Sequence, residues 1–207
     1  MTIYRDIIQR SPEWYAIRCG KFTASDFDTL MPSSRQRETD WNETQLKIIY
    51  RVAAERMTGL AKEQSWDSKP VEWDREKEEE ARFAYELETG NEVEQVGFIE
   101  LDDWIGCSPD GLIREDGYWE AKCPNSDTHL RYSLAPHELE ENYGWQVMGG
   151  LWISGRAWAH IVSYDPRFKD EKKQLVVWSI ARDEDAIERL AFRLSLAVER
   201  AKEIIGG

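Results

Sequence analysis

The chain is poor in cysteine and histidine, the residues that most often bind zinc. Its three cysteines leave an odd count and show no metal-ligand spacing, so we expect free thiols in a reducing compartment. Three histidines add few further zinc ligands. A bound metal is therefore expected to have oxygen ligands, which favours Mg²⁺, with Mn²⁺ as a substitute. The residues concerned are Cys19, Cys107, Cys123, His129, His137 and His160.

Long apolar runs are also missing. No run approaches the roughly 20 residues that a membrane span needs, and the N-terminal stretch MTIYRDIIQR lacks the apolar core of a signal peptide. We expect a soluble cytoplasmic protein with no membrane partner. No repeat, linker or low-complexity segment divides the 207 residues, and 41% hydrophobic with 12% aromatic content is typical of a folded chain. The expectation is one domain, residues 1–207.

Positive charge is the third shortage, with 27 basic against 40 acidic residues and a net charge of −13. Proteins that bind nucleic acid are usually basic. The excess acid, however, is concentrated in three stretches that are typical of solvated helix ends and faces. They are Glu76–Glu80, Glu138–Glu141 and Asp183–Asp185. A small local basic channel remains compatible with this balance.

Apolar spacing and capping residues predict helices and strands that alternate along the chain, which indicates an α/β domain. The predicted helices are 11–20, one capped by Thr23 or Ser25 that runs to Leu30, 42–58, 71–89, 139–153 and a long one after Asp183. The predicted strands are 93–101, 104–110, a strand-like run near 120–122, 156–164 and 172–180. Residues 32–41 read as a polar loop, and 125–137 show no clear period. The apolar stripe of the last helix either closes the core or forms a subunit contact.

The stretch GCSPDGLIREDGYWEAKCP, residues 106–124, holds the strongest candidate site. Glu120 and Lys122 are two apart on a strand, so their side chains lie on the same face. A hairpin through the turn near Asp116 and Gly117 brings Asp110 beside them. Two carboxylates can hold a hard divalent cation, and a lysine can orient a water, as metal-assisted hydrolysis of a phosphodiester requires. The alternative is a surface hairpin with a salt bridge.

The order Ser-Pro-Asp-Gly and then Glu-Ala-Lys-Cys-Pro resembles the PD-(D/E)xK nucleases. Among them it is most similar to the YqaJ-like viral recombinases, the alkaline exonucleases related to phage lambda exonuclease. The resemblance implies a restriction-endonuclease-like core, in which helices flank a mixed central sheet. It also implies that Asp110, Glu120 and the Ala121 carbonyl hold one or two magnesium ions, and that Lys122 positions the attacking water.

A second block, with Arg18 followed by Thr23-Ala24-Ser25, resembles the part of these exonucleases that grips a terminal 5′-phosphate. The resemblance makes Arg18 the anchor and makes Ser25 and Ser108 supporting donors. Taken alone, the block is more typical of a surface arginine and an ordinary capping serine.

Three further positions come from the same resemblance. Periodicity does not choose between Glu78 and Glu80 as a third metal ligand, but the family has a glutamate five residues after a tryptophan, and Trp73 makes that Glu78. Gln146 matches a glutamine that helps to order the catalytic centre. His129 lies in a segment similar to one in bacterial and phage homologues, where it either touches DNA phosphate or supports the site.

The resemblance as a whole implies a metal-dependent 5′-to-3′ exonuclease, encoded by a phage or prophage and acting in the bacterial cytoplasm. Such an enzyme degrades one strand of linear duplex DNA from a 5′-phosphorylated end and leaves a 3′ single strand for an annealing protein. Family members form ring-shaped homotrimers, so a homotrimer is expected. Two alternatives remain: a PD-(D/E)xK endonuclease for restriction or repair, which would cut closed circles, and a non-catalytic DNA-binding protein that has kept the fold.

Overall fold

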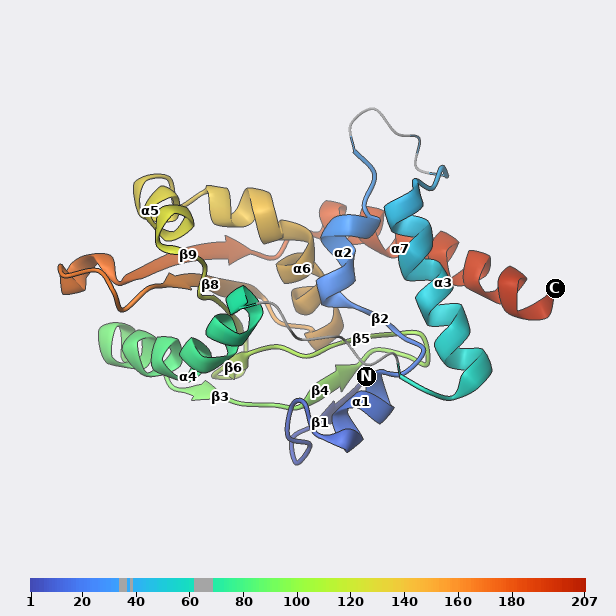
Figure 1. Ribbon diagram of the computed structural model, residues 1–207, viewed down its shortest axis with the longest axis horizontal. Helices are drawn as coiled ribbons and strands as arrows, with labels where there is room; N and C mark the ends of the chain where they lie inside the picture. The colour runs from blue at the N-terminus through green and yellow to red at the C-terminus, as the bar shows by residue number, and fades with distance from the viewer. Residues whose placement is uncertain (34–36, 38, 62–68) are drawn as a thin grey trace.

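Two β-sheets form the centre of the computed structural model, which describes residues 1–33, 37, 39–61 and 69–207 (Figure 1). One has five strands in the order β3-β6-β7-β8-β9, and the other has four in the order β1-β4-β5-β2. The strands are β1 Thr2–Tyr4, β2 Phe22–Thr23, β3 Val93–Glu94, β4 Phe98–Glu100, β5 Ile105–Cys107, β6 Gly111–Ile113, β7 Gly117–Lys122, β8 Trp158–Tyr164 and β9 Leu175–Ala181.

The five-stranded sheet is mixed, as predicted. β6 and β7 form an antiparallel hairpin, β7 runs parallel to β8, and β8 pairs with β9 antiparallel. Gly111 pairs with Trp119, so the next position along the hairpin places Asp110 across from Glu120. A parallel pair needs a long crossover, and here the chain from β7 to β8 passes through two helices, α5 and α6.

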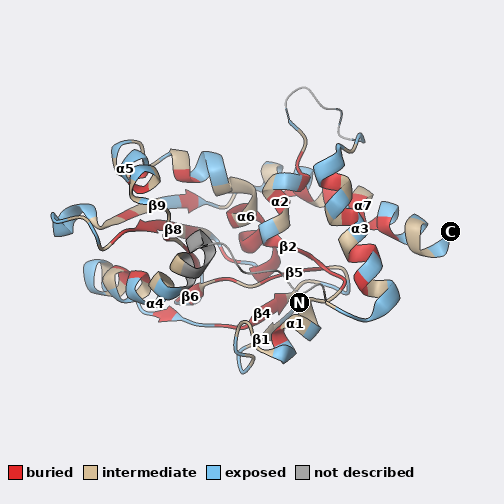
Figure 2. Ribbon diagram, in the orientation of Figure 1, coloured by how far each residue is buried: buried red, intermediate tan, exposed pale blue. Residues whose placement is uncertain are grey.

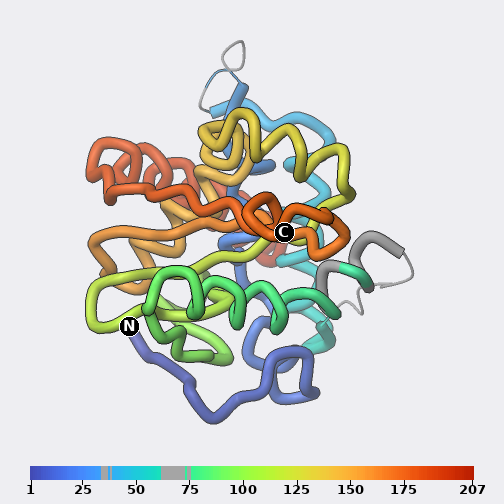
Figure 3. The backbone as a smooth tube through the Cα atoms, turned by 90° about the vertical axis from the view of Figure 1, so that its left-hand side faces the viewer, coloured from blue at the N-terminus to red at the C-terminus, as the bar shows by residue number. Residues whose placement is uncertain are grey.

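Helices cover both faces of this sheet. The helices are α1 Pro12–Arg18, α2 Ala24–Leu30, α3 Glu43–Thr58, α4 Lys69–Thr89, α5 Ser126–Leu134, α6 Glu138–Ser154 and α7 Glu184–Gly206, with a 3₁₀ turn Glu171–Lys173 before β9. Figure 1 shows α4 on one side of β8 and β9, and α5 with α6 on the other. α2 packs on α6, and α3 packs on α7. In the turned view of Figure 3, the N-terminal segment lies at the lower edge of the molecule, below α4.

Buried side chains follow the sheets and the inward faces of the helices (Figure 2). The larger core cluster includes the predicted stripe of α7, with Leu190 and Leu194 fully buried, so that this stripe closes the core. A smaller cluster lies between α4 and the sheet around Tyr85 and Trp119. The acidic stretches are largely exposed, as predicted. In the described part of the chain, no helix combines the length and the apolar character that crossing a bilayer requires.

Local signals explain most of the helix ends. Ser11 Oγ accepts a hydrogen bond from the Trp14 amide at 3.2 Å, and Pro12 opens α1. Asn42 caps α3, and Asp183 caps α7 through two backbone amides. Gly59 ends α3 at φ 69°, in the left-handed region that favours glycine. The predicted bounds of these helices are confirmed to within a few residues.

Two predicted segments differ from the structure. The strand predicted over 93–101 is split into β3 and β4, which belong to different sheets. At Gly97, between them, a Cβ would lie 2.1 Å from the Ile7 carbonyl oxygen, so the N-terminal segment occupies the place of a side chain. Residues 125–137, which show no period, contain α5, whose buried residues are only His129 and Tyr132. Of the predicted polar loop 32–41, residues 34–36 and 38 lie outside the described residues.

Candidate active site

Three side chains converge at the end of the β6–β7 hairpin. Asp110 Oδ2 accepts a hydrogen bond from the Ala121 amide at 2.8 Å, which fixes it against the neighbouring strand. Lys122 Nζ lies 2.8 Å from Glu120 Oε1 on the shared face of β7. Glu120 is only 2% exposed. The hairpin therefore brings together Asp110, Glu120 and Lys122, as the sequence predicts.

The carboxylate of Glu120 is held from several directions. Tyr118, two residues earlier on the same face, donates to Glu120 Oε2 at 3.1 Å. From α6, the Gln146 side-chain amide donates to Glu120 Oε1, while its oxygen accepts from Lys122 Nζ at 3.3 Å. Networks of this kind fix the orientation of every member. The structure thus places Gln146, predicted to help order the catalytic centre, in contact with Lys122 and Glu120.

Negative charge is concentrated at this site. Burial, together with the charges of Glu120 and Glu78, raises the pKa of Asp110 well above its usual range. Burial, with the charge of Glu120 next, also raises the pKa of Tyr118. A divalent cation offsets this kind of repulsion, and carboxylate and carbonyl oxygens are the ligands that magnesium prefers. Asp110, Glu120 and the Ala121 carbonyl therefore fit such an ion by their chemistry.

Glu78 is near this site but is held by another partner. Its Oε2 lies 2.9 Å from a guanidinium nitrogen of Arg10, a residue whose φ of 70° is unusual outside glycine. Both residues line a pocket of about 350 Å³ together with Asp110. Within the described residues, no group of three or more His, Cys, Asp or Glu side chains is arranged to hold a metal ion. The structure thus brings Asp110 and Glu120 together and leaves Glu78 paired with arginine.

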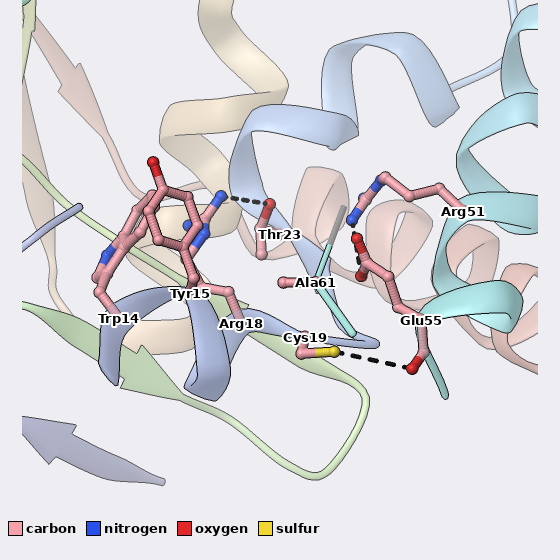
Figure 4. Close-up of a pocket in the computed structure, with 8 residues that line it drawn as sticks. All are labelled: Trp14, Tyr15, Arg18, Cys19, Thr23, Arg51, Glu55 and Ala61. Atoms are coloured by element: carbon pink, nitrogen blue, oxygen red, sulfur yellow. Dashed lines mark hydrogen bonds and ion pairs between the residues drawn. The ribbon is translucent and has the colours of Figure 1, made fainter. Parts of the chain in front are cut away.

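The predicted phosphate anchor forms a second pocket (Figure 4), with a cavity volume of about 30 Å³. Arg18 lies over the Trp14 ring, 4.1 Å from its centroid, and donates to Ser108 Oγ at 2.9 Å. Its other terminal nitrogen is 3.4 Å from Thr23 Oγ1. Burial lowers the pKa of Arg18 to about 10, which leaves the guanidinium charged at neutral pH. Arg51, on the opposite wall, pairs with Glu55.

The two serines predicted as donors contact residues that line this pocket, although neither lines it. Ser108 Oγ accepts from both Trp14 Nε1 and Arg18, at 2.8 and 2.9 Å. A hydroxyl that accepts two hydrogen bonds has its own hydrogen left to donate. Ser25 is exposed, and its Oγ is 3.1 Å from Thr23 Oγ1. Arg18 is thus bonded directly to Ser108, and Thr23 links it to Ser25.

His129 is the exception among the predicted site residues. It is fully buried, with Nδ1 2.7 Å from Ser163 Oγ and Nε2 2.8 Å from the Lys173 carbonyl. Both ring nitrogens are thus engaged inside the protein, and Phe168 packs against the ring. A direct contact of His129 with DNA phosphate does not agree with this placement. The other predicted role, a scaffold that ties α5 to β8, does.

Several site residues escaped the sequence reasoning. Tyr118 could have been predicted from the sequence, because alternation along the strand puts it on the same face as Glu120 and Lys122. Arg10 and Asp28 were not, since their partners Glu78 and Gln146 are 68 and 118 positions away in the chain. No local pattern records such pairs.

The fold and the site together define a nuclease of the PD-(D/E)xK class, with the acid pair and lysine on a hairpin of a mixed sheet. The family model of the YqaJ-like viral recombinase domain matches residues 13–157, more than half of the chain. The chain therefore belongs to the YqaJ-like viral recombinase family, which confirms the resemblance drawn from its motifs. A search of the curated proteins found no match.

Solved structures agree with this assignment. A crystal structure of an alkaline exonuclease, LHK-Exo, from Laribacter hongkongensis is 29% identical, with a TM-score of 0.83 and 95% of each chain covered. The same protein in complex with dAMP gives the same values. A phage-related exonuclease from Haemophilus somnus 129PT is 15% identical, with a TM-score of 0.73, over 90% of this chain and 95% of that one. At that identity the last likeness shows the fold alone.

Proposed function

We propose that this chain is a magnesium-dependent 5′-to-3′ exonuclease that degrades one strand of linear duplex DNA from a 5′-phosphorylated end. The observation that carries the proposal is the convergence of Asp110, Glu120, Lys122 and Gln146 on one hairpin edge. A second pocket, lined by Arg18, stands beside it and has the chemistry of a phosphate anchor.

The chain's own residues divide the work of hydrolysis. When bound, a divalent cation supplies electrophilic stabilisation of the phosphate and a more acidic water. Lys122, held 2.8 Å from Glu120, would donate a hydrogen bond to the attacking water and so orient it. Gln146 holds the Lys122 ammonium and the Glu120 carboxylate in fixed positions by hydrogen bonding to both. Asp110, fixed by the Ala121 amide, would hold the cation together with Glu120 and the Ala121 carbonyl.

The anchor explains why such an enzyme starts at an end. Arg18 offers a charged, planar donor group to a terminal phosphate, and Ser108 and Ser25 offer hydroxyls. Ser108 and Asp110 are two residues apart, which places their Cα atoms at most about 7 Å from each other. A terminal phosphate seated at Ser108 therefore leaves the next phosphate of the strand close to Asp110.

The relatives support this reading. LHK-Exo is described as an alkaline exonuclease and binds dAMP in one crystal structure, and a deoxynucleoside monophosphate is the product expected of exonuclease action here. By the same family analogy we propose a homotrimer in a bacterial cytoplasm that hands a 3′ single strand to an annealing protein. Sedimentation analysis tests the trimer independently of the chemistry.

The decisive experiment compares nucleotide release from linear duplexes with 5′-phosphate and with 5′-hydroxyl ends, in Mg²⁺ and after chelation. We expect release in Mg²⁺ only, faster from phosphorylated ends. Efficient cutting of closed circles would instead indicate an endonuclease. Absence of release from every substrate would indicate a non-catalytic DNA-binding protein.

A further inference from the structure

The helix that begins at the anchor pocket is bonded directly to the helix that carries Gln146. Asp28, on α2, accepts a hydrogen bond from the Trp145 amide on Oδ1 and another from the Gln146 amide on Oδ2, both at 3.0 Å. α2 and α6 lie side by side in Figure 1. Through these bonds a single carboxylate joins two segments that are more than 100 positions apart in the chain.

This contact is not an ordinary helix cap. Trp145 and Gln146 lie in the interior of α6, where an amide normally bonds the carbonyl four residues earlier. A carboxylate that reaches them from a neighbouring helix therefore fixes α6 at this turn. Its position is unfavourable in itself, because burial raises the pKa of Asp28, and the two amides act against that effect.

The next turn of α6 is confined on both sides. A Cβ on Gly149 would lie 2.2 Å from the Phe27 ring of α2, and a Cβ on Gly150 would lie 2.4 Å from the Tyr118 ring of β7. The helix therefore sits in close contact with the anchor helix and with the catalytic strand at once. Tyr118 itself donates to Glu120. Such close packing restricts the rotation of α6 about its axis, and the Asp28 carboxylate adds two polar contacts at Trp145 and Gln146.

We propose that Asp28 is a positioning residue, which sets Gln146 against Glu120 and Lys122 and so ties the anchor helix to the hydrolytic side of the site. The inference rests on the proposed function, since it assigns a role within that reaction. Asp28 touches neither substrate nor metal in this role. It acts through Gln146, and α2 carries it one turn after Ser25.

The test is a double-mutant cycle on kcat and KM for a 5′-phosphorylated duplex. Asp28→Asn keeps the shape but replaces one acceptor oxygen with an NH₂ group, and Asp28→Ala removes both acceptors. We expect kcat to fall about tenfold or more with KM changed less than about twofold, as for a displaced catalytic group. In a Gln146→Ala background, either substitution is expected to change kcat less than about twofold, because their effects run through the same residue.

Asp183→Ala is the matched control. Its carboxylate also accepts from two backbone amides, at 3.0 and 3.1 Å, but these amides belong to the first turn of α7 and not to α6. We expect Asp183→Ala to lower the thermal midpoint and leave kcat unchanged. A kcat unchanged in Asp28→Ala, or an equal loss from Asp28→Ala with and without Gln146, would overturn the inference.

A second readout does not depend on activity. Amide hydrogen exchange in residues 138–154 is expected to be faster in Asp28→Asn than in the unmutated protein, with other segments unchanged. Equal exchange in the two proteins would refute the positioning role. If the unmutated protein releases no nucleotide, the proposed function fails, and the exchange experiment still decides whether Asp28 fixes this turn.

Discussion

The two pockets of this molecule are built on opposite principles. On the hydrolytic side, carboxylates are buried close together. Burial is the main cause of the raised pKa of Asp110, and repulsion from the neighbouring carboxylates raises it further. On the anchor side, a cation is partly buried over an indole ring and bonded to neutral hydroxyls. By its charge, the first side is suited to a positive ion and the second to a negative one. Both remain next to each other because Ser108 and Asp110 belong to one short segment.

The difference assigns the two sides different parts of the reaction. A site that concentrates negative charge is suited to holding a metal for chemistry, which affects the rate of bond cleavage. A site that offers a guanidinium and hydroxyls is suited to binding, which affects the choice of substrate. Substitutions on the two sides should therefore separate rate from preference.

The largest effect is expected on the hydrolytic side. Lys122→Ala removes the donor proposed to orient the attacking water, and Asp110→Ala removes a proposed metal ligand. Each should lower nucleotide release by about 1000-fold or more on every kind of end, while circular dichroism shows a folded protein. Lys47→Ala, an exposed lysine 71% accessible in its side chain, is the control and should act normally. Substantial hydrolysis by Lys122→Ala would contradict the assignment.

The next effect belongs to the anchor side. Arg18→Ala should slow release from 5′-phosphorylated ends by about 30-fold, the loss of roughly 2 kcal/mol from a charge-assisted hydrogen bond, and leave 5′-hydroxyl ends nearly unchanged. The measurement is the ratio of rates on the two kinds of end. Arg200→Ala, which breaks a surface pair with Glu203, should keep the ratio of the unmutated protein. If the unmutated protein cuts both ends equally, the anchor hypothesis is wrong.

A smaller effect tests whether Glu78 is a shared ligand. Arg10→Ala frees Glu78 from a partly buried ion pair, and such pairs contribute up to about 1 kcal/mol. Mg²⁺ should then bind up to about fivefold more tightly by calorimetry without DNA. Arg131→Ala, which breaks a surface pair with Glu138 outside this pocket, should leave the affinity unchanged. Weaker Mg²⁺ binding by Arg10→Ala would mean that the arginine supports the site rather than competing with the ion.

The smallest expected effect is a change in stability with pH that arises at His160, outside both pockets. Burial lowers the pKa of His160, whose Nδ1 is 2.7 Å from the Tyr85 hydroxyl. Below pH 6.5, the ordinary pKa of this group, the unfolded chain binds the proton more readily than the folded chain. Stability should therefore decrease as pH falls below that value. Urea unfolding between pH 7.5 and 5.5, repeated with His160→Gln, should show part of the decrease disappearing in the variant.

The sequence predicted best what depends on neighbours along the chain. The hairpin trio follows from alternation on a strand and a turn, and helix ends follow from residues such as Ser11 and Gly59. The sequence did not predict what depends on tertiary approach. One example is the close approach of the Ile7 carbonyl to Gly97, at the point where the predicted strand is split in two. Others are the hydrogen bonds of Asp28 and Arg10, which join segments that are distant in the chain. The role of His129 was ambiguous because the sequence around a histidine does not show whether its side chain is buried. Its hydrogen bond to Ser163 inside the protein favours the scaffold role.

The acidic outer faces of the helices have a kinetic consequence. A chain with a net charge of −13 repels a duplex at long range, so added salt, by screening that repulsion, should speed the first encounter with DNA. The same salt should weaken the proposed binding of Arg18 to the terminal 5′-phosphate. Turnover is then expected to pass through an optimum in ionic strength, unlike the steady decline typical of basic DNA-binding proteins.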